Sequence, residues 1–342
     1  MVAIPPRCKR LRMHTHRVRP NVFGMPFGFC GLAQCWATAH VAGVPRWPAD
    51  ALWIVTVVVW GATLVWYGRD VVRGGRWRTE LRDPIFGPFT ALIVIVPMFL
   101  GVALAGHART AGEIVFGVAL VLTVAVGGVL SGIWITADLQ LAQWHPGYFL
   151  PTVGGGLIAA GGCAALGHRT LAMVMFGYGV ICWLILGTIV LLRLFTVAAL
   201  PPPLRPTIAI EVAPPVVAGN AWFLMNGGRI DAVAAGLAGY AILMVIVQLT
   251  LIPVYRRVPF GPGWWAFSFS YAAAFTLGVH WLDAGGAVAR TVWTGVLLAV
   301  LTLGIVALAA RTARRLVHGT YLPASHGAPP ETTLAVPAGT AR

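Results

Sequence analysis

Residues 211–222, EVAPPVVAGNAW, place a carboxylate and two adjacent prolines inside an otherwise apolar run. Glu211 lies three residues before Pro214, and Pro215 follows directly. A carboxylate costs free energy in hydrocarbon, and proline removes a helical hydrogen bond. Lipid cannot satisfy the carbonyl that proline frees, whereas a neighbouring helix or a water-filled cavity can. The stretch therefore predicts a helix that faces a cavity or other helices.

The composition of the whole chain indicates the class of protein around this stretch. The 342 residues are 58% hydrophobic and 10% charged, and the mean hydropathy is +0.81. A water-soluble protein of this length needs more charge to cover its surface, so an integral membrane protein is the class that fits. Each apolar segment is long enough to cross about 30 Å of hydrocarbon as a helix. We predict an all-α fold with ten such segments, at 21–42, 49–67, 85–106, 113–137, 146–166, 170–195, 204–225, 230–254, 262–282 and 287–310.

The distribution of basic residues predicts the orientation in the membrane. An even number of spans puts both termini on one side, and the segments on that side contain 19 of the 24 basic residues. The positive-inside rule then places both termini in the cytoplasm. Residues 1–20 are interpreted as a basic arm without the apolar region of a cleavable signal peptide. Residues 21–310 are expected to form the membrane domain, and 311–342 a cytoplasmic tail whose composition is typical of disorder.

Proline recurs at a nearly constant interval along the chain. Pro26, Pro88, Pro151 and Pro214 are separated by 62, 63 and 63 residues, and all four lie in odd-numbered apolar segments. A period of about 60 residues predicts a repeated helical hairpin. We expect the prolines to kink four helices that face inward, and five inner helices ringed by five outer ones are the simplest arrangement. Glycines in the same segments, such as Gly28, fit either an inward-facing wall or close helix packing.

Three motifs resemble one known family of membrane proteins. They are FGMPFGFCGLA (23–33), LRPTIAIEVAPPVVAG (204–219) and WWAFSFSYAAAFTLG (264–278). In order and spacing they are similar to the tellurite-resistance/dicarboxylate transporter family, over about residues 20–310. The resemblance implies five helical hairpins in quasi-fivefold order around a central pore, and a homotrimer in the plasma membrane. It also implies transport of small anions without ATP, such as C4-dicarboxylates, sulfite or tellurite.

The resemblance also implies a gate. In the family, a phenylalanine of the ninth helix plugs the pore within a pattern like WWAYTFP, and Phe269 occupies its position here. The usual next proline is Ser270 in this chain, so Phe267 or Tyr271 could share the role. Ordinary packing of Phe269 remains the alternative.

Polar residues of the inner segments are candidates for contact with an anion or a proton. The hydroxyls of Thr90, Thr152, Thr207, Ser268 and Ser270 could replace water around an anion, or could bond back to their own helices. Glu211 could carry a proton alongside the anion, which would make the protein a proton-coupled carrier. The alternative is a neutral structural glutamate near the two prolines.

Basic and histidine side chains at the ends of the segments have two interpretations each. Arg205 and the arginines of residues 69–82 either concentrate anions at the pore or only set the topology. His145 and His280, near opposite ends of inner segments, either sense pH or simply meet water.

No cofactor, metal site or nucleic-acid partner is expected. The five cysteines form no CxxC pair and lack histidine partners at ligand spacing. A membrane-embedded enzyme is one rival class, but the chain lacks HExxH and paired acidic residues. A structural membrane protein is the other, although it does not explain the recurring prolines. The residues do not distinguish among the possible anions, nor a channel from a carrier.

Overall fold

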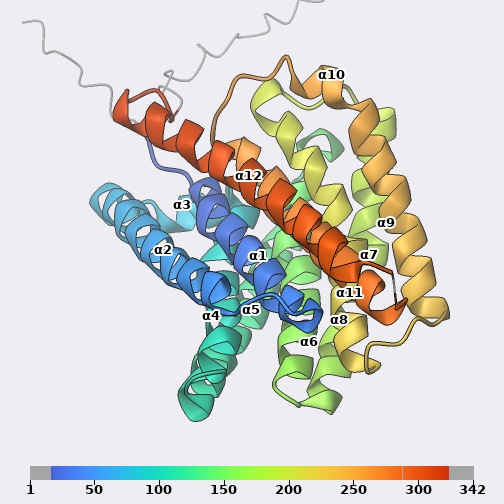
Figure 1. Ribbon diagram of the computed structural model, residues 1–342. Helices are drawn as coiled ribbons and strands as arrows, with labels where there is room; N and C mark the ends of the chain where they lie inside the picture. Colours follow the sequence, from blue (N-terminus) through green and yellow to red (C-terminus); the bar gives the residue numbers. More distant parts are fainter. Residues whose placement is uncertain (1–16, 287, 323–342) are drawn as a thin grey trace, which may run out of the picture.

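The computed structural model describes residues 17–286 and 288–322, and every regular element in this part of the chain is a helix (Figure 1). The expected all-α fold is therefore confirmed. Residues 1–16 of the expected basic arm and 323–342 of the expected tail lie outside the described residues. The last helix continues to Val317, beyond the expected end of the membrane domain at residue 310.

Eight helical segments within the described residues are long and apolar enough to cross a membrane. Residues 20–42 and 262–284 are helical as well, but they are not among these eight. The candidate spans are Trp47–Gly74, Gly87–Ala105, Arg109–Thr136, Pro146–Ala165, Arg169–Thr196, Pro202–Met225, Ala232–Thr250 and Arg290–Val317.

Five helices contact one another in a closed sequence around the centre of the molecule. They are α1 (Gly24–Thr38), α4 (Leu92–Ala105), α6 (Gly155–Ala165), α8 (Ala213–Met225) and α11 (Ala266–Ala284). Each packs against the next, and α11 packs against α1. These five are hereafter the inner helices.

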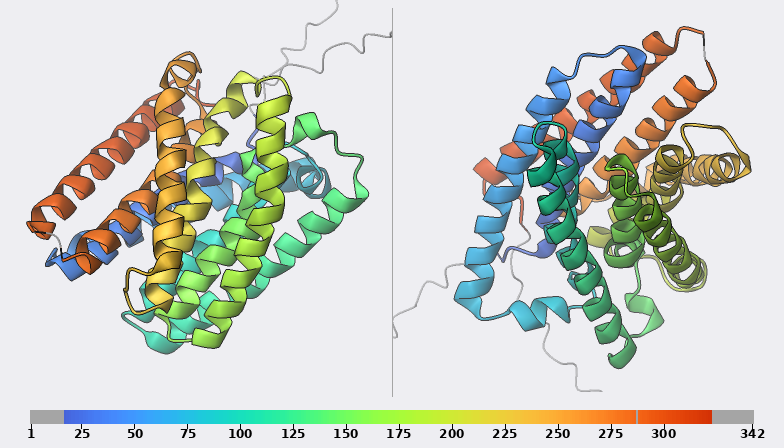
Figure 2. Two further views of the ribbon diagram at one scale, coloured as in Figure 1. Left: turned by 90° about the vertical axis from the view of Figure 1, so that its right-hand side faces the viewer. Right: turned by 90° about the horizontal axis from the view of Figure 1, so that it is seen from below.

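A longer helix follows each inner helix along the chain and packs against it. These outer helices are α2 (Trp47–Gly74), α5 (Arg109–Thr136), α7 (Arg169–Thr196), α9 (Ala232–Thr250) and α12 (Arg290–Val317). They expose many valine, leucine and isoleucine side chains, as lipid-facing helices do. Figure 1 shows α12, in red, running diagonally in front of α11, with α1, in blue, beside it, and Figure 2 shows the outer helices from two further sides.

The recurring prolines lie in, or within three residues after, the irregular turns that precede the inner helices. Pro88 lies in η3 (Gly87–Ala91) before α4, and Pro151 lies in a π-helical turn, η6 (Leu150–Gly154), before α6. Pro26 is close to the start of α1, and Pro214 and Pro215 open α8 after η7 (Pro202–Val212). Since proline donates no hydrogen bond, it suits the first turn of a helix. The repeated feature is thus a change of helix type near the first residue of each α-helix.

Sequence periodicity missed the fifth of these turns. Pro262 opens η8 (Pro262–Trp265) before α11, and it lies four residues before the first residue of that helix. Pro88 and Pro151 have the same relation to α4 and α6. The interval from Pro214 to Pro262 is only 48 residues, so the regular spacing does not reach it.

Glycines let α1 approach α11 closely. A Cβ on Gly24 would lie 3.0 Å from the Cβ of Trp265, and one on Gly31 would lie 2.7 Å from the Cβ of Ala272. Gly28, between them, faces Ser268 and Trp265 in the same way. Close packing, the alternative considered for these glycines, is therefore what the structure shows on this face of α1.

Smaller elements connect the long helices. They are η1 (Pro20–Phe23), η2 (Ala39–Ala42), α3 (Trp77–Leu81), η4 (Leu141–Gln143), η5 (Pro146–Tyr148) and α10 (Ile252–Tyr255). Near α3 the buried Glu80 carboxylate pairs with Arg17 and lies 3.8 Å from Arg19. The Arg19 guanidinium also donates to Asp83 at 3.1 Å. These ion pairs attach the start of the described chain to the segment that precedes α4.

Candidate functional site

Two cavities lie between the inner helices, one above the other along the bundle. The first, of about 50 Å³, is lined by the N-terminal parts of these helices and includes Ile210, Pro214 and Ala266. The second, of about 90 Å³, is lined by their C-terminal parts and includes Gln34, Asn220 and His280. They are called the proximal and the distal cavity. Leu157, Val217 and Phe269 line both.

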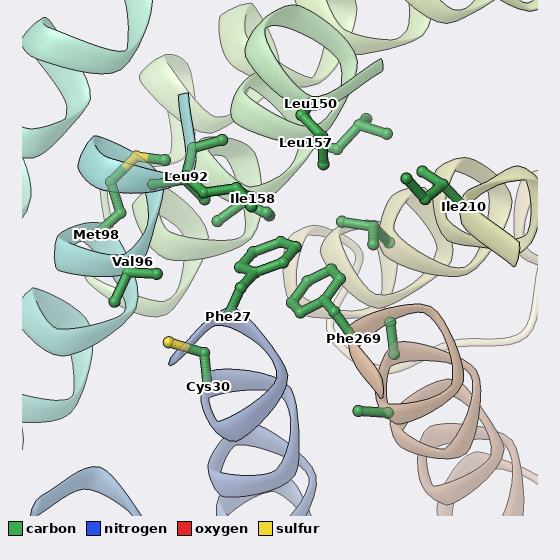
Figure 3. Close-up of a cluster of buried hydrophobic side chains, with 14 of the residues drawn as sticks. Phe27, Cys30, Leu92, Val96, Met98, Leu150, Leu157, Ile158, Ile210 and Phe269 are labelled. Atoms are coloured by element: carbon green, nitrogen blue, oxygen red, sulfur yellow. The ribbon is translucent and has the colours of Figure 1, made fainter. Parts of the chain in front are cut away.

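Phe269 lies at the junction of the two cavities. Its ring stacks on that of Phe27, with a centroid distance of 3.7 Å and an interplanar angle of 16°. Phe99 meets the Phe269 ring edge-on at 5.8 Å. Figure 3 shows the Phe27 and Phe269 rings side by side, from α1 and α11, with Leu157 and Ile158 above them. The two stacked rings therefore separate the cavities with an apolar layer.

A larger space opens from the proximal cavity where both ends of the described chain meet. This vestibule, of about 480 Å³, is lined by Arg17 and Arg19 at one end of the chain and by Tyr321 and Leu322 at the other. It shares Asn21, Pro262 and Gly263 with the proximal cavity. The vestibule, the proximal cavity and the distal cavity thus follow one another in series. The phenylalanine pair separates the proximal cavity from the distal one.

Arginines give the vestibule a positive character. Arg17 and Arg19 are held by Glu80 and Asp83. Arg315 lines the vestibule from α12, and no carboxylate of the described residues lies within ion-pair distance of it. Arg205 donates instead to the Leu200 carbonyl at 3.0 Å and is not a lining residue. The arginines at this opening therefore differ from those that the sequence suggested.

The two phenylalanines considered for the gate face different surroundings. Phe269 is 7% exposed and lines both cavities. Phe267 packs against Tyr255, at a ring-centroid distance of 4.9 Å, and Tyr271 stacks beside it. Neither Phe267 nor Tyr271 is a lining residue of either cavity, and both line a groove on the outside of α11. The structure brings only Phe269 to the junction.

Most candidate hydroxyls bond to their own helices. Ser268 donates to the Trp265 carbonyl at 2.6 Å, Ser270 to Ala266 at 3.1 Å, and Thr207 to Leu204 at 2.6 Å. This is the back-bonding alternative, which suits a hydroxyl in apolar surroundings. Of the candidates, only Ser270 lines a cavity.

Thr90 and Thr152 are the remaining two candidates. Thr90 donates to the Gly87 carbonyl at 2.6 Å, another bond within its own helix. The Thr152 hydroxyl has no hydrogen-bond partner within the described part of the chain, but its side chain lies beside Gly127 of α5 rather than in a cavity.

Glu211 is buried beside the proximal cavity rather than in its wall. Its neighbour Ile210 lines that cavity, but Glu211 does not. The carboxylate lies within electrostatic reach of the Tyr240 and Tyr255 phenols, toward α9 and α10. Its Oε1 atom has no hydrogen-bond partner among the residues that the structure describes. Glu211 and the cavity-lining residues are therefore brought close together but not into one site.

Of the two histidines, His145 differs from the expectation that it meets water. His145 is fully buried, its Nδ1 accepts from the Gly147 N–H, and its Nε2 lies 3.0 Å from the Ile85 carbonyl. Burial lowers the pKa of His145 to about 4, so this histidine is neutral near pH 7 and its Nε2–H donates to Ile85. His280 stacks on Phe223 at 5.3 Å and lines the distal cavity.

Sequence reasoning missed several lining residues. Phe27 is one of three phenylalanines in residues 23–29, and no spacing distinguishes it from Phe23 or Phe29. Asn220 lies in the opening stretch itself; its amide donates to the Ala273 carbonyl at 2.9 Å, while its Oδ1 has no partner in the described chain. A polar side chain on the same helix as Pro214 is the signal that could have identified Asn220.

The chain matches known proteins over the region that contains both cavities. The profile of the family described as SLAC1, voltage-dependent anion channel, matches residues 17–313. The tellurite resistance protein TehA homolog of Haemophilus influenzae is 29% identical over 260 residues, which cover 73% of this chain and 77% of that protein. The S-type anion channel SLAH3 of Arabidopsis thaliana is 24% identical over 306 residues, covering 85% of this chain. The match covers 47% of SLAH3, so the chain spans about half of that relative.

Proposed function

Because the chain belongs to the SLAC1 family of voltage-dependent anion channels, we propose that it moves small anions along the axis of its inner helices, with Phe269 as the gate. The observation behind this proposal is the pair of cavities that meet at Phe269. Two stacked aromatic rings form an apolar constriction, and such constrictions close pores by excluding water. Movement of the Phe269 ring would join the cavities into one path.

The path crosses the membrane in the following arrangement. Residues 20–42 and 262–284 span the bilayer together with the eight apolar candidates, which makes ten spans in five hairpins of quasi-fivefold order. The closed sequence of contacts among the inner helices supports this order. The vestibule faces the cytoplasm, in line with the positive-inside rule. By the family resemblance, three such chains form a homotrimer in the plasma membrane, with one pore each.

The cavities are suited to small anions that are held weakly. Among the residues that the structure describes, no Lys, Arg, Asp or Glu lines either cavity, so no fixed charge of this part of the chain traps or repels an ion inside. Gln34, Asn220, Thr276 and His280 give the distal cavity its polar groups. Tellurite, sulfite and C4-dicarboxylates are the proposed substrates, in line with the relative named for tellurite resistance.

Anion flux into liposomes that contain the purified chain tests this function. Uptake of chloride, nitrate, sulfite and malate is measured with and without a pH gradient. We expect uptake that follows the electrochemical gradient of at least one of these anions and needs no ATP. If no anion moves under any gradient, the chain is a membrane enzyme or a structural protein instead.

Replacing Arg315 tests the vestibule. Arg315→Gln is expected to lower anion flux at low ionic strength by roughly two- to tenfold, because a charged opening concentrates its counter-ion. The effect is expected to shrink near 1 M salt, where the screening length is about 3 Å. Arg257→Gln, which removes the same charge from an exposed position outside the vestibule, is the control. Equal effects of the two substitutions would contradict a local role.

Glu211→Gln tests proton coupling. Glu211 was considered as a proton carrier or as a neutral structural glutamate, and the position of the carboxylate outside both cavities favours the structural role. We therefore expect Glu211→Gln to leave both the anion flux and its dependence on pH unchanged, measured in the same liposomes with and without a pH gradient. Loss of the pH dependence with flux retained would instead establish Glu211 as the proton carrier.

A further inference from the structure

A groove of about 470 Å³ runs along the outer face of α11 and α12, on the side of α11 away from the cavities. Aromatic side chains of α11 form one wall, with Phe267 and Tyr271 stacked at a centroid distance of 6.1 Å. Residues of α12 form the other wall, among them Leu301 and Leu308. We call it the α11–α12 groove.

The floor of the groove is open at Gly304. A Cβ built on this glycine would meet no described residue within 4 Å, so the space above it is unfilled by the part of the chain that the structure describes. Along α12 the lining extends from Val300 to Arg311, a rise of about 16 Å for a helix. That length is close to half of the roughly 30 Å hydrocarbon thickness, which is the depth of one leaflet.

One end of the groove is strongly basic. Arg311 lines the groove and also a neighbouring cavity of about 420 Å³, whose other lining residues are Arg314, Arg315, His318 and Thr320. The Arg311 guanidinium lies 4.7 Å from the centre of the Phe260 ring. Within the described chain, no carboxylate forms an ion pair with Arg311, Arg314 or Arg315.

An apolar slot of one leaflet's depth that ends in three arginines is complementary to one class of molecule. We propose that the α11–α12 groove binds a phospholipid with an anionic headgroup, whose acyl chain lies over Gly304 and whose phosphate contacts Arg311 and Arg314. Guanidinium groups pair well with phosphate oxygens, and basic pockets beside membrane helices recognise anionic lipids. Aromatic and leucine side chains match the acyl chain.

This binding site shares a helix with the gate. Phe267 and Tyr271 face the groove from α11, and Phe269 faces the cavities from the same turns of that helix. The site depends on insertion into a bilayer but not on which anion is transported. Lipid binding and anion flux are therefore separate measurements, and failure of one leaves the other standing.

Native mass spectrometry of the purified full-length chain tests the proposal. The protein is titrated with phosphatidylglycerol, and separately with phosphatidylcholine of the same acyl chains. We expect a saturable phosphatidylglycerol adduct and a weaker one with phosphatidylcholine. Gly304→Leu is expected to abolish the tight adduct, because the new side chain fills the groove. Gly295→Leu, on the same helix, also in open space and outside the groove, is expected to keep it.

Two double variants that remove the same number of positive charges separate headgroup from acyl-chain binding. Arg311→Gln with Arg314→Gln is expected to weaken the phosphatidylglycerol adduct roughly fivefold for each arginine removed. Arg256→Gln with Arg257→Gln removes the same charge elsewhere and is expected to leave it unchanged. Equal affinity for both lipids, or an adduct that survives Gly304→Leu, overturns the proposal. Competition by glycerol 1-phosphate alone also overturns the proposal. A change of subunit number in Gly304→Leu, without any lipid adduct to the unsubstituted chain, would instead make the groove a contact between copies.

Discussion

Phe269→Ala is expected to raise anion flux through the protein by roughly tenfold or more, because it removes half of an apolar constriction. The Phe269 ring lies between the proximal and distal cavities and stacks on Phe27 at 3.7 Å. With only a methyl group at position 269, the two cavities merge beside the Phe27 ring. Water then enters the junction, and an anion no longer has to cross a dry layer.

The flux is measured as nitrate or chloride efflux from liposomes that contain equal amounts of each protein. Phe267→Ala is the matched control, since it removes the same ring two residues away on the same helix but from the outer groove. It is expected to leave the flux near that of the unsubstituted chain. A Phe269→Ala protein that remains folded and transports no faster would place the gate elsewhere. Equal increases in both variants would indicate general loosening of α11.

Gly28→Val is expected to destabilise the fold more than any other single change discussed for this chain. A Cβ on Gly28 would lie 2.7 Å from the Cβ of Ser268 and 2.9 Å from the Cε3 of Trp265. Trp265 is also fixed, because its indole N–H donates to Thr312 of α12 at 3.0 Å. Overpacking of this kind costs about 1–3 kcal/mol and occasionally more, and here backbone as well as side chains must move.

The measurement is the thermal unfolding midpoint of the detergent-solubilised protein. Gly61→Val is the control, because Gly61 lies on α2 and no residue in the described ranges comes within 4 Å of an added Cβ. We expect a midpoint for Gly28→Val several degrees below that of Gly61→Val, or a protein that fails to accumulate. If the two variants unfold at the same temperature, the α1–α11 contact is not what holds these helices together.

The positions of the helices and the family could be predicted from the sequence, because both depend on local patterns: apolar segments for the helices and short motifs for the family. The helices overlap the predicted apolar segments: α5 covers Arg109–Thr136 where 113–137 was expected, whereas α2 and α12 end seven residues later than expected. The match to residues 17–313 confirms the family resemblance drawn from three motifs. Four of the five irregular turns were marked by prolines at regular intervals, and the fifth was hidden by a shorter interval.

Side-chain direction was the main quantity that the sequence could not supply. Glu211 and Ile210 are neighbours, yet only Ile210 lines the proximal cavity. Phe267 and Phe269 lie on opposite faces of α11, although the sequence left Phe267 as a residue that could share the role of Phe269. The pairing of Arg17 with Glu80 joins residues 63 positions apart. Each of these outcomes depends on how helices rotate and pack, which a single sequence does not record.

Thiol block of the Phe269→Ala conductance tests the central claim, that anions pass through both cavities. Single cysteines are placed on α11 at Ala266, in the proximal cavity, and at Ala273, in the distal cavity. Ala307→Cys, in the α11–α12 groove, and the Phe269→Ala parent are the controls. A methanethiosulfonate reagent is predicted to reduce the current of both cavity variants and to leave both controls unchanged. Current that persists in the modified Ala266→Cys and Ala273→Cys proteins would contradict a path along the axis of the inner helices.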